Sequence, residues 1–179
     1  MDEKIFVGEI EKCQTIELPA GLKLYRGSTR SNPRDDPDRK RITGVPSFAF
    51  EKDYALMYAN PDPGIHPNHR KMVPGDRSVL FTATLNERCT VIVLPNVGET
   101  FNRANSRGAK CYWTFEKTEL LPLARRVLNN KLIAGYIGAS DISQAREVIL
   151  DLELARITDV SVDFLHPAMG LAMSHQRRA

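Results

Sequence analysis

Leu22–Ser28 (LKLYRGS), followed further along by Pro46–Ala59 (PSFAFEKDYALMYA), decides the fold that this sequence predicts. The first stretch alternates apolar and polar residues, which is typical of a half-buried strand, here one that ends at Arg26. Gly27 then allows the backbone to turn or to be approached closely. In the second stretch an apolar strand carrying Ser47 runs into a helix whose alanines allow close packing against a sheet. An arginine and a serine at the edges of two strands indicate a site that holds a phosphate or a nucleotide.

The composition is that of one soluble globular domain spanning residues 1–179. Hydrophobic residues make up 42% of the chain and charged residues 26%, both ordinary values. We expect residues 1–21 to be an N-terminal extension and residues 166–179 a C-terminal tail. The net charge of +3 is below that of a dedicated nucleic-acid-binding protein, but it suits a protein that handles an anionic small molecule.

The cysteines and the N-terminus indicate where the protein works. The three cysteines are odd in number, far apart and without a CxxC pair, so we expect buried, reduced thiols. They are Cys13, Cys89 and Cys111. No segment approaches the length of a membrane span, and the acidic, mixed N-terminus is unlike a signal peptide. The sequence therefore predicts a cytoplasmic protein without membrane contact.

The order of the expected elements predicts an α+β fold. Apolar and β-branched runs predict strands at 22–25, 45–50, 78–85, 90–94, 133–139, 147–152 and 158–164. We expect helices after Asp53, a candidate N-cap, and from Thr118, with a loop at 95–108. These roughly six or seven strands and two or three helices do not alternate regularly, which favours a mostly antiparallel sheet. Neither a GxGxxG nor a GxxxxGK[ST] motif is present, so no Rossmann or P-loop site is predicted.

Two polar segments are candidate binding sites. Residues 29–43 are rich in arginine and aspartate, and we interpret them as a solvated surface loop whose charges offset one another. RNA or DNA binding through Arg34–Arg41 and the basic tail is a weaker alternative. His66 and His69 lie in the second segment, residues 60–77, without cysteine or carboxylate partners at ligand spacing, so we predict no metal site.

Three polar residues stand at the edges of apolar strands and together suggest a reaction. Arg26 offers a permanent charge suited to a phosphate, and the Ser47 hydroxyl can orient a ligand or a neighbouring carboxylate. Glu147, at the start of a strand, can hydrogen-bond a ribose hydroxyl and stabilise the positive charge that a sugar ring develops when its glycosidic bond breaks. The trio suits cleavage of the bond between the sugar and the base of a nucleotide.

The order of these three residues resembles the R-S-E pattern of the mono-ADP-ribosyltransferases. Residues 24–27 (LYRG) are similar to the first motif of that family. Residues 47–59 resemble its Ser-Thr-Ser strand and the following helix, with a spacing close to that of phage-encoded members. Residues 147–150 (EVIL) are similar to the strand that carries the catalytic glutamate. The resemblance extends over residues 22–163 in the order of the elements.

This resemblance implies a split-sheet fold that binds NAD as a substrate and transfers ADP-ribose to a macromolecular acceptor, a protein or a nucleic acid. Arg26, with Gly27 beside it, would hold the phosphates or a ribose of NAD. Ser47 would position Glu147. Glu147 would hydrogen-bond the nicotinamide ribose and stabilise the oxocarbenium ion as nicotinamide leaves. It also implies a toxin or effector acting in the cytoplasm, of a host cell if the protein is phage-encoded.

Further residues follow from the same resemblance. Phe50 and Tyr54 would lie near the nicotinamide, with core packing as the alternative, and residues 138–146 would face the acceptor. In the family the residue two before the catalytic glutamate is usually Glu or Gln, whereas here it is Ala145, with Gln144 before it. NAD hydrolysis, another acceptor, or a non-catalytic module that binds NAD or a protein therefore remain open, as does the oligomeric state.

Overall fold

The computed structural model describes residues 1–29, 35–59, 78–106, 108, 110–140 and 142–165. The helices are α1 (Glu3–Ile10), α2 (Lys52–Ala59), α3 (Val97–Ala104), α4 (Tyr112–Thr118), α5 (Leu120–Val127) and a short 3₁₀ turn, η1 (Ile142–Gln144). The strands are β1 (Gln14–Leu18), β2 (Lys23–Thr29), β3 (Asp35–Asp36), β4 (Arg41–Ile42), β5 (Ser47–Ala49), β6 (Ser78–Leu85), β7 (Cys89–Val93), β8 (Ile133–Ile137), β9 (Glu147–Leu150) and β10 (Ile157–Phe164).

Eight of these strands form one sheet in the order β1-β7-β8-β9-β5-β2-β6-β10. Every neighbouring pair is antiparallel except β7 and β8, which run parallel. The two remaining strands, β3 and β4, form a separate two-stranded ladder. The prediction of an α+β fold with a mostly antiparallel sheet is confirmed.

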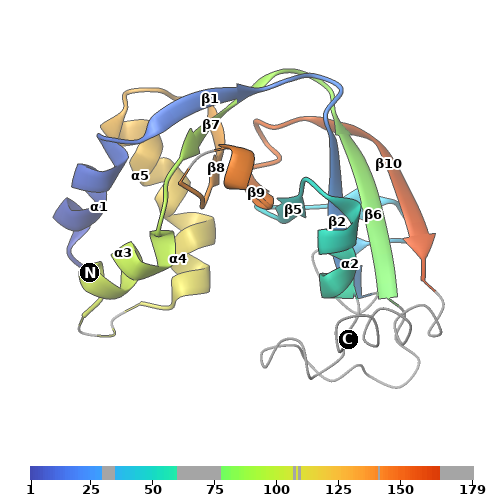
Figure 1. The fold of residues 1–179 in the computed structure, drawn as a ribbon, viewed down its shortest axis with the longest axis horizontal. Helices are drawn as coiled ribbons and strands as arrows, with labels where there is room; N and C mark the ends of the chain where they lie inside the picture. Colours follow the sequence, from blue (N-terminus) through green and yellow to red (C-terminus); the bar gives the residue numbers. More distant parts are fainter. Residues whose placement is uncertain (30–34, 60–77, 107, 109, 141, 166–179) are drawn as a thin grey trace.

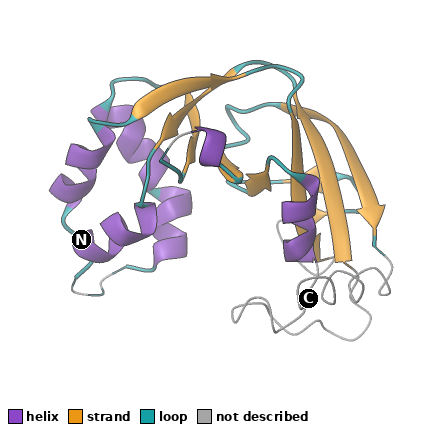
Figure 2. Cartoon of the chain, viewed as in Figure 1, coloured by secondary structure: helices purple, strands orange, loops and turns teal. Residues whose placement is uncertain are grey.

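The sheet is nearly divided between β5 and β2. These strands share a single register pair, Tyr25 with Ala49, whereas β2 is paired with β6 along its whole length, Lys23 to Thr29. Helices α1, α3, α4 and α5 gather on the half that contains β1, β7 and β8, while α2 lies against β2 on the other half (Figures 1 and 2). The two halves of the sheet thus meet at the short pairing of β5 with β2.

The molecule has two large apolar cores. The first lies among the helices of the first half and β8, and its large buried side chains are Phe6, Phe101, Phe115, Leu120 and Tyr136. The second, the strand core, runs along the sheet through both halves, and its large buried side chains include Leu24, Phe48, Phe81, Leu85 and Val148. Burial of these side chains from water holds the helices on the sheet and the two halves of the sheet together.

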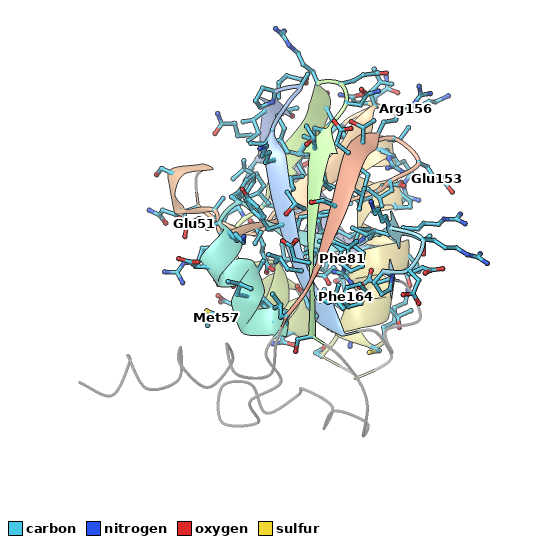
Figure 3. All side chains as sticks on the ribbon, turned by 90° about the vertical axis from the view of Figure 1, so that its right-hand side faces the viewer. Glu51, Met57, Phe81, Glu153, Arg156 and Phe164 are labelled. Atoms are coloured by element: carbon cyan, nitrogen blue, oxygen red, sulfur yellow. The ribbon has the colours of Figure 1, made fainter. Side chains whose placement is uncertain are left out.

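Helix α2 packs closely on β2 because the strand carries a glycine at the contact. A Cβ atom on Gly27 would lie 1.9 Å from the carbonyl oxygen of Ala55 and 2.6 Å from the nitrogen of Ala59. The close approach expected at Gly27 is therefore made by α2. Figure 3 shows α2 lying beside the sheet. The expected strand end at Arg26 is wrong, because β2 continues through Arg26 and Gly27 to Thr29.

Residues 1–21, expected to be an extension, complete the first half. Phe6 and Ile10 on α1 are fully buried, and β1 pairs with β7 at the edge of the sheet. Asp2 caps α1 by accepting a hydrogen bond from the backbone N–H of Lys4 at 3.0 Å. The expected tail, residues 166–179, lies outside the described residues.

Two predictions of helix starts and one prediction of a loop were wrong. Helix α2 begins at Lys52, so Asp53 lies in its first turn instead of capping it. Thr118 ends α4 and does not begin α5, because its hydroxyl donates to the carbonyl of Thr114 within α4. The expected loop at 95–108 contains α3, whose buried residues recur at helical spacing.

The three cysteines differ in their exposure to solvent. Cys89 is buried and Cys13 is half-buried, but Cys111 is exposed, so the prediction of buried thiols is wrong there. Burial raises the pKa of the Cys89 thiol to about 11, which keeps that thiol protonated. Of the described helices, none is long and apolar enough to cross a membrane.

Candidate functional site

Ser47 and Glu147 meet across β5 and β9. In the antiparallel register Ala49 lies opposite Glu147, and Ser47 is two residues along the same strand. Because side chains alternate between the two faces of a sheet, Ser47 and Glu147 are diagonal neighbours on one face. The Ser47 hydroxyl donates a hydrogen bond of 2.8 Å to Oε2 of Glu147. The fold thus joins two residues that are 100 positions apart in the sequence.

Arg26 reaches the same place from β2. Its Nη1 donates to the backbone carbonyl oxygen of Ser47 at 3.0 Å, so the arginine braces the strand that carries the serine. Its Nε donates to both carboxylate oxygens of Asp35 at 3.1 Å, and its Nη2 lies 3.0 Å from Oδ2 of Asp35. The structure therefore brings all three residues of the predicted trio together, with the charge of Arg26 paired to Asp35.

Asp35 corrects the interpretation of residues 29–43 as a solvated loop. Its side chain has no exposed surface, and it also accepts a hydrogen bond from the Ser28 hydroxyl. The β3–β4 ladder carries it under Arg26. Arg34, like the rest of residues 30–34, lies outside the described residues. Direct contact between Arg26 and the phosphates of NAD remains a prediction.

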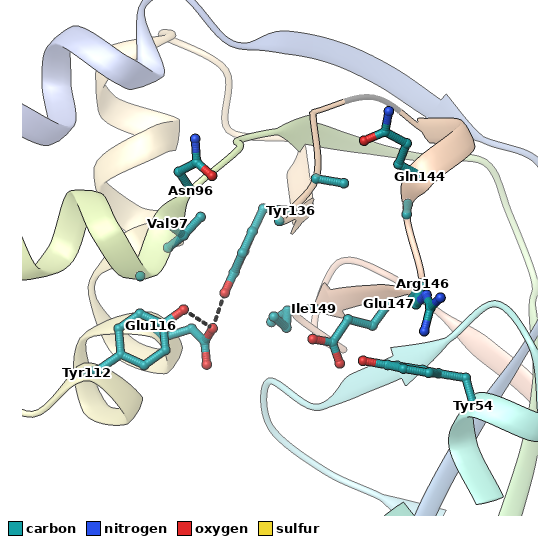
Figure 4. Close-up of a pocket in the computed structure, with 14 residues that line it drawn as sticks. Tyr54, Asn96, Val97, Tyr112, Glu116, Tyr136, Gln144, Arg146, Glu147 and Ile149 are labelled. Carbon is teal, nitrogen blue, oxygen red and sulfur yellow. Dashed lines mark hydrogen bonds between the residues drawn. The ribbon is translucent and has the colours of Figure 1, made fainter. Parts of the chain in front are cut away.

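Glu147 lines a cavity of about 380 Å³. The segment 138–146, expected to face an acceptor, supplies Gly138, Ala139, Gln144, Ala145 and Arg146 to its wall. The facing wall comes from α3, α4 and β8, which contribute Val97, Gly98, Tyr112, Glu116 and Tyr136. Figure 4 shows Glu147 reaching into this pocket from β9, with Tyr54 and Arg146 beside it.

Tyr54 forms an aromatic side of the pocket. Its ring lies under the guanidinium of Arg146, with 5.5 Å from the guanidinium carbon to the ring centroid. Its hydroxyl is 3.0 Å from that of Tyr58, whose pKa is raised by burial, by this hydrogen bond and by the charge of Glu147. Phe50 is placed differently, because it packs against the strand core and its backbone N–H donates to the carbonyl of Arg146.

A second carboxylate, Glu116, lines the pocket and was not predicted from the sequence. The residue is only 5% exposed, and its Oε1 accepts hydrogen bonds from the hydroxyls of Tyr112, at 3.0 Å, and Tyr136. Figure 4 shows Glu116 reaching from α4 toward Glu147 across the pocket. The spacing of Tyr112 and Glu116, four residues apart on one helix face, is a sequence pattern that could have pointed to this pair.

Both tyrosines beside Glu116 are held in their protonated form. Burial and the negative charge of Glu116 raise the pKa of Tyr136 and of Tyr112 well above the ordinary value for a phenol. Each hydroxyl therefore keeps its proton and donates a hydrogen bond to the carboxylate. The result is an acidic group fixed in orientation by two neutral donors.

The pocket offers two carboxylates, one guanidinium and several tyrosines. Among the described residues there is no group of three or more His, Cys, Asp or Glu side chains placed to hold a metal ion. His66 and His69 lie outside the described residues. The side chains that are present suit electrostatic stabilisation, proton transfer and stacking on an aromatic ring.

Comparisons with known proteins show a distant likeness in fold. No protein-family model matches the sequence, and no curated protein sequence does. Among solved structures, the chain is similar to one in the crystal structure of the M. tuberculosis MbcT–MbcA toxin–antitoxin complex. The TM-score is 0.49 at 12% identity, covering 96% of this chain and 98% of that one. A likeness this distant supports no function, so the site is classified from its own residues. The protein has a mostly antiparallel α+β fold, and its pocket contains a carboxylate, Glu147, that is hydrogen-bonded by Ser47.

Proposed function

We propose that this protein cleaves the bond between nicotinamide and ribose in NAD and transfers the ADP-ribose to a macromolecular acceptor. The observation that carries the proposal is the 2.8 Å hydrogen bond from Ser47 to Glu147 at the wall of the pocket. Arg26 braces Ser47 from a third strand. The trio whose order resembles that of the ADP-ribosyltransferases is thus also a trio in space.

Glu147 is suited to stabilise the charge that forms as the bond breaks. When nicotinamide leaves with the bonding electrons, the ribose ring gains positive charge at C1′. A carboxylate that is held in place before the reaction stabilises that charge without reorganising. The hydrogen bond from Ser47 fixes one carboxylate oxygen and leaves the other for a ribose hydroxyl. Glu147 therefore stabilises the charge, and Ser47 and Arg26 act by positioning it.

The pocket suits the nicotinamide–ribose half of NAD. Its volume of about 380 Å³ is toward the small end of the roughly 300–1,000 Å³ usual for small-molecule sites. The Tyr54 ring offers a face to an aromatic group, and the adenosine half would extend outside the cavity. Arg146 adds a positive charge at this wall, where a phosphate of NAD can be held.

Ala145 favours one alternative, NAD hydrolysis. It lines the pocket at the position where the resembled family usually carries Glu or Gln, which helps to select the acceptor. With no acceptor bound, water would take the ribose and free ADP-ribose would be released. A non-catalytic module of the same fold would instead bind NAD without any release of nicotinamide.

Incubation with NAD labelled in its adenylate part, together with a cell lysate, tests the proposal. We expect label on macromolecules, and protease or nuclease digestion then shows which kind of acceptor carries it. Label found only in free ADP-ribose would establish the hydrolase instead. Binding of NAD in calorimetry without nicotinamide release, with or without lysate, would overturn the enzymatic proposal.

A further inference from the structure

Glu116 is a buried carboxylate for which the described residues provide no ion-pair partner. It is 5% exposed, and its hydrogen bonds come from two neutral hydroxyls. Burying a charged group without a cation is costly, and such groups are usually found where a ligand or a proton completes them. The proposed role of Glu147 makes no use of this residue. Glu116 therefore needs an explanation of its own.

The two oxygens of Glu116 differ in their surroundings. Tyr112 and Tyr136 both donate to Oε1. None of the described donors forms a hydrogen bond to Oε2. Every fully buried side-chain nitrogen or oxygen of the described residues has a hydrogen-bond partner, so Oε2 is not fully buried. Because Glu116 lines the cavity, this oxygen faces the cavity. One oxygen is held by the protein and the other is available to a molecule in the pocket.

The substrate's own positive charge is a poor partner for this oxygen. The nicotinamide ring of NAD is cationic when bound and becomes neutral as the bond breaks. A carboxylate that stabilised the cationic ring would favour the bound substrate over the transition state and slow the reaction. Glu116 faces Glu147 across the pocket (Figure 4), so a ribose held by Glu147 would present its other side to Glu116.

We propose that Glu116 is the general base for the acceptor, an inference that rests on the proposed function. The acceptor's O–H or N–H group attacks C1′ of the ribose, and its proton passes to Oε2 of Glu116. The C1′–N bond to nicotinamide breaks, and its electron pair neutralises the ring nitrogen. The products are ADP-ribosyl acceptor, neutral nicotinamide and one proton, which Glu116 then releases to water.

This assignment also limits the chemical class of the acceptor. A base is needed only for a nucleophile that carries a proton, such as water, a hydroxyl or an amide nitrogen. A carboxylate or a phosphate has already lost its proton at neutral pH and would need no base. The acceptor is therefore a neutral, proton-bearing group and not a carboxylate or a phosphate.

Chemical rescue with azide tests this role. Nicotinamide release is measured for the wild type, Glu116→Gln and Glu116→Ala, with and without sodium azide. Loss of a general base should slow release about a hundredfold or more in both variants. Azide is already deprotonated and needs no base, so it should restore release in Glu116→Ala and yield ADP-ribosyl azide, identified by mass spectrometry. Glu99→Gln, an exposed glutamate on α3, is the matched control and should behave as the wild type.

The possible failures can be told apart. No release by the wild type would overturn the proposed function, and this inference with it. An active wild type with an equally active Glu116→Gln would overturn the inference alone. Slow variants that keep the wild-type Tm but are not rescued by azide would show that Glu116 only shapes the pocket, which also overturns it. If Glu116→Ala does not fold, azide rescue of Glu116→Gln decides the question in the same way.

Discussion

The two carboxylates of the pocket are held in opposite ways. Glu147 lies half-buried on β9 and receives a hydroxyl from Ser47, while the nearby charge of Arg26 is matched by Asp35. Glu116 lies buried on α4 between two tyrosines and without a described ion pair. In enzymes, carboxylates in different surroundings take different tasks, some in acid–base chemistry and some in charge stabilisation. The difference between the two surroundings supports the roles proposed above, charge stabilisation for Glu147 and proton transfer for Glu116.

Replacing Asp35 should disturb the residues that position Glu147 and produce the largest effect on stability. Asp35→Ala leaves the guanidinium of Arg26 largely buried, with 14% side-chain exposure and without its anion. Breaking a buried ion pair costs about 3–5 kcal/mol of the free energy of unfolding. For a chain of this size we expect Tm to fall by about 6–20 °C, measured by differential scanning calorimetry.

The neighbouring residue Asp36 provides the matched control. Its carboxylate lies 3.6 Å from the guanidinium of Arg39, and both side chains are well exposed, 44% for Asp36 and 80% for Arg39. An exposed pair of this kind contributes about 0–1 kcal/mol, so Asp36→Ala should change Tm little. Equal falls in Tm for the two variants would contradict the role given to Asp35 beneath Arg26.

Removing the hydroxyl of Ser47 should change the orientation of Glu147 alone, with a smaller effect that appears in the rate of nicotinamide release. Ser47→Ala leaves Glu147 in the pocket without the donor that orients it. A hydrogen bond to a charged group contributes about 1.5–3 kcal/mol, so kcat for nicotinamide release should fall roughly ten- to a hundredfold with KM little changed. Steady-state kinetics measure both constants.

Two further serine variants separate orientation from general damage. Ser47→Thr keeps a hydroxyl and should retain much of the wild-type kcat. Ser161→Ala, at an exposed serine of β10, should have no effect. A wild-type kcat for Ser47→Ala would contradict the positioning role and leave the hydrogen bond as a feature of folding alone.

Much of the fold was predictable because its strands are locally encoded. The runs at 78–85 and 90–94 are rich in β-branched residues, and the structure has β6 and β7 there, within a residue of the expected bounds. The mostly antiparallel sheet followed from the irregular order of strands and helices. Helix α3 was missed, although Val97, Thr100, Phe101 and Ala104 recur at helical spacing. It begins after Asn96, which has φ of 57° and no side-chain cap, so the usual start pattern was absent.

The candidate site was predictable only where it follows the strands. The order of Arg26, Ser47 and Glu147 was visible in the sequence, and their meeting in space agrees with it. Asp35 was read as a surface charge, because nothing local shows that a short ladder carries it beneath Arg26. The orientation of Glu116 depends on a hydrogen bond from Tyr136, twenty positions away on β8. A contact of that kind results from the packing of the fold and leaves no local motif in the sequence.

The most direct test of the central claim is nicotinamide release by Glu147→Gln. The substitution keeps the shape of the side chain and removes its charge, so release should fall about a hundredfold or more while Tm and calorimetric binding of NAD stay close to the wild type. Glu51→Gln, at the exposed position before α2 shown in Figure 3, is the matched control and should release nicotinamide normally. Release by Glu147→Gln at the wild-type rate would contradict the claim that this carboxylate drives NAD cleavage.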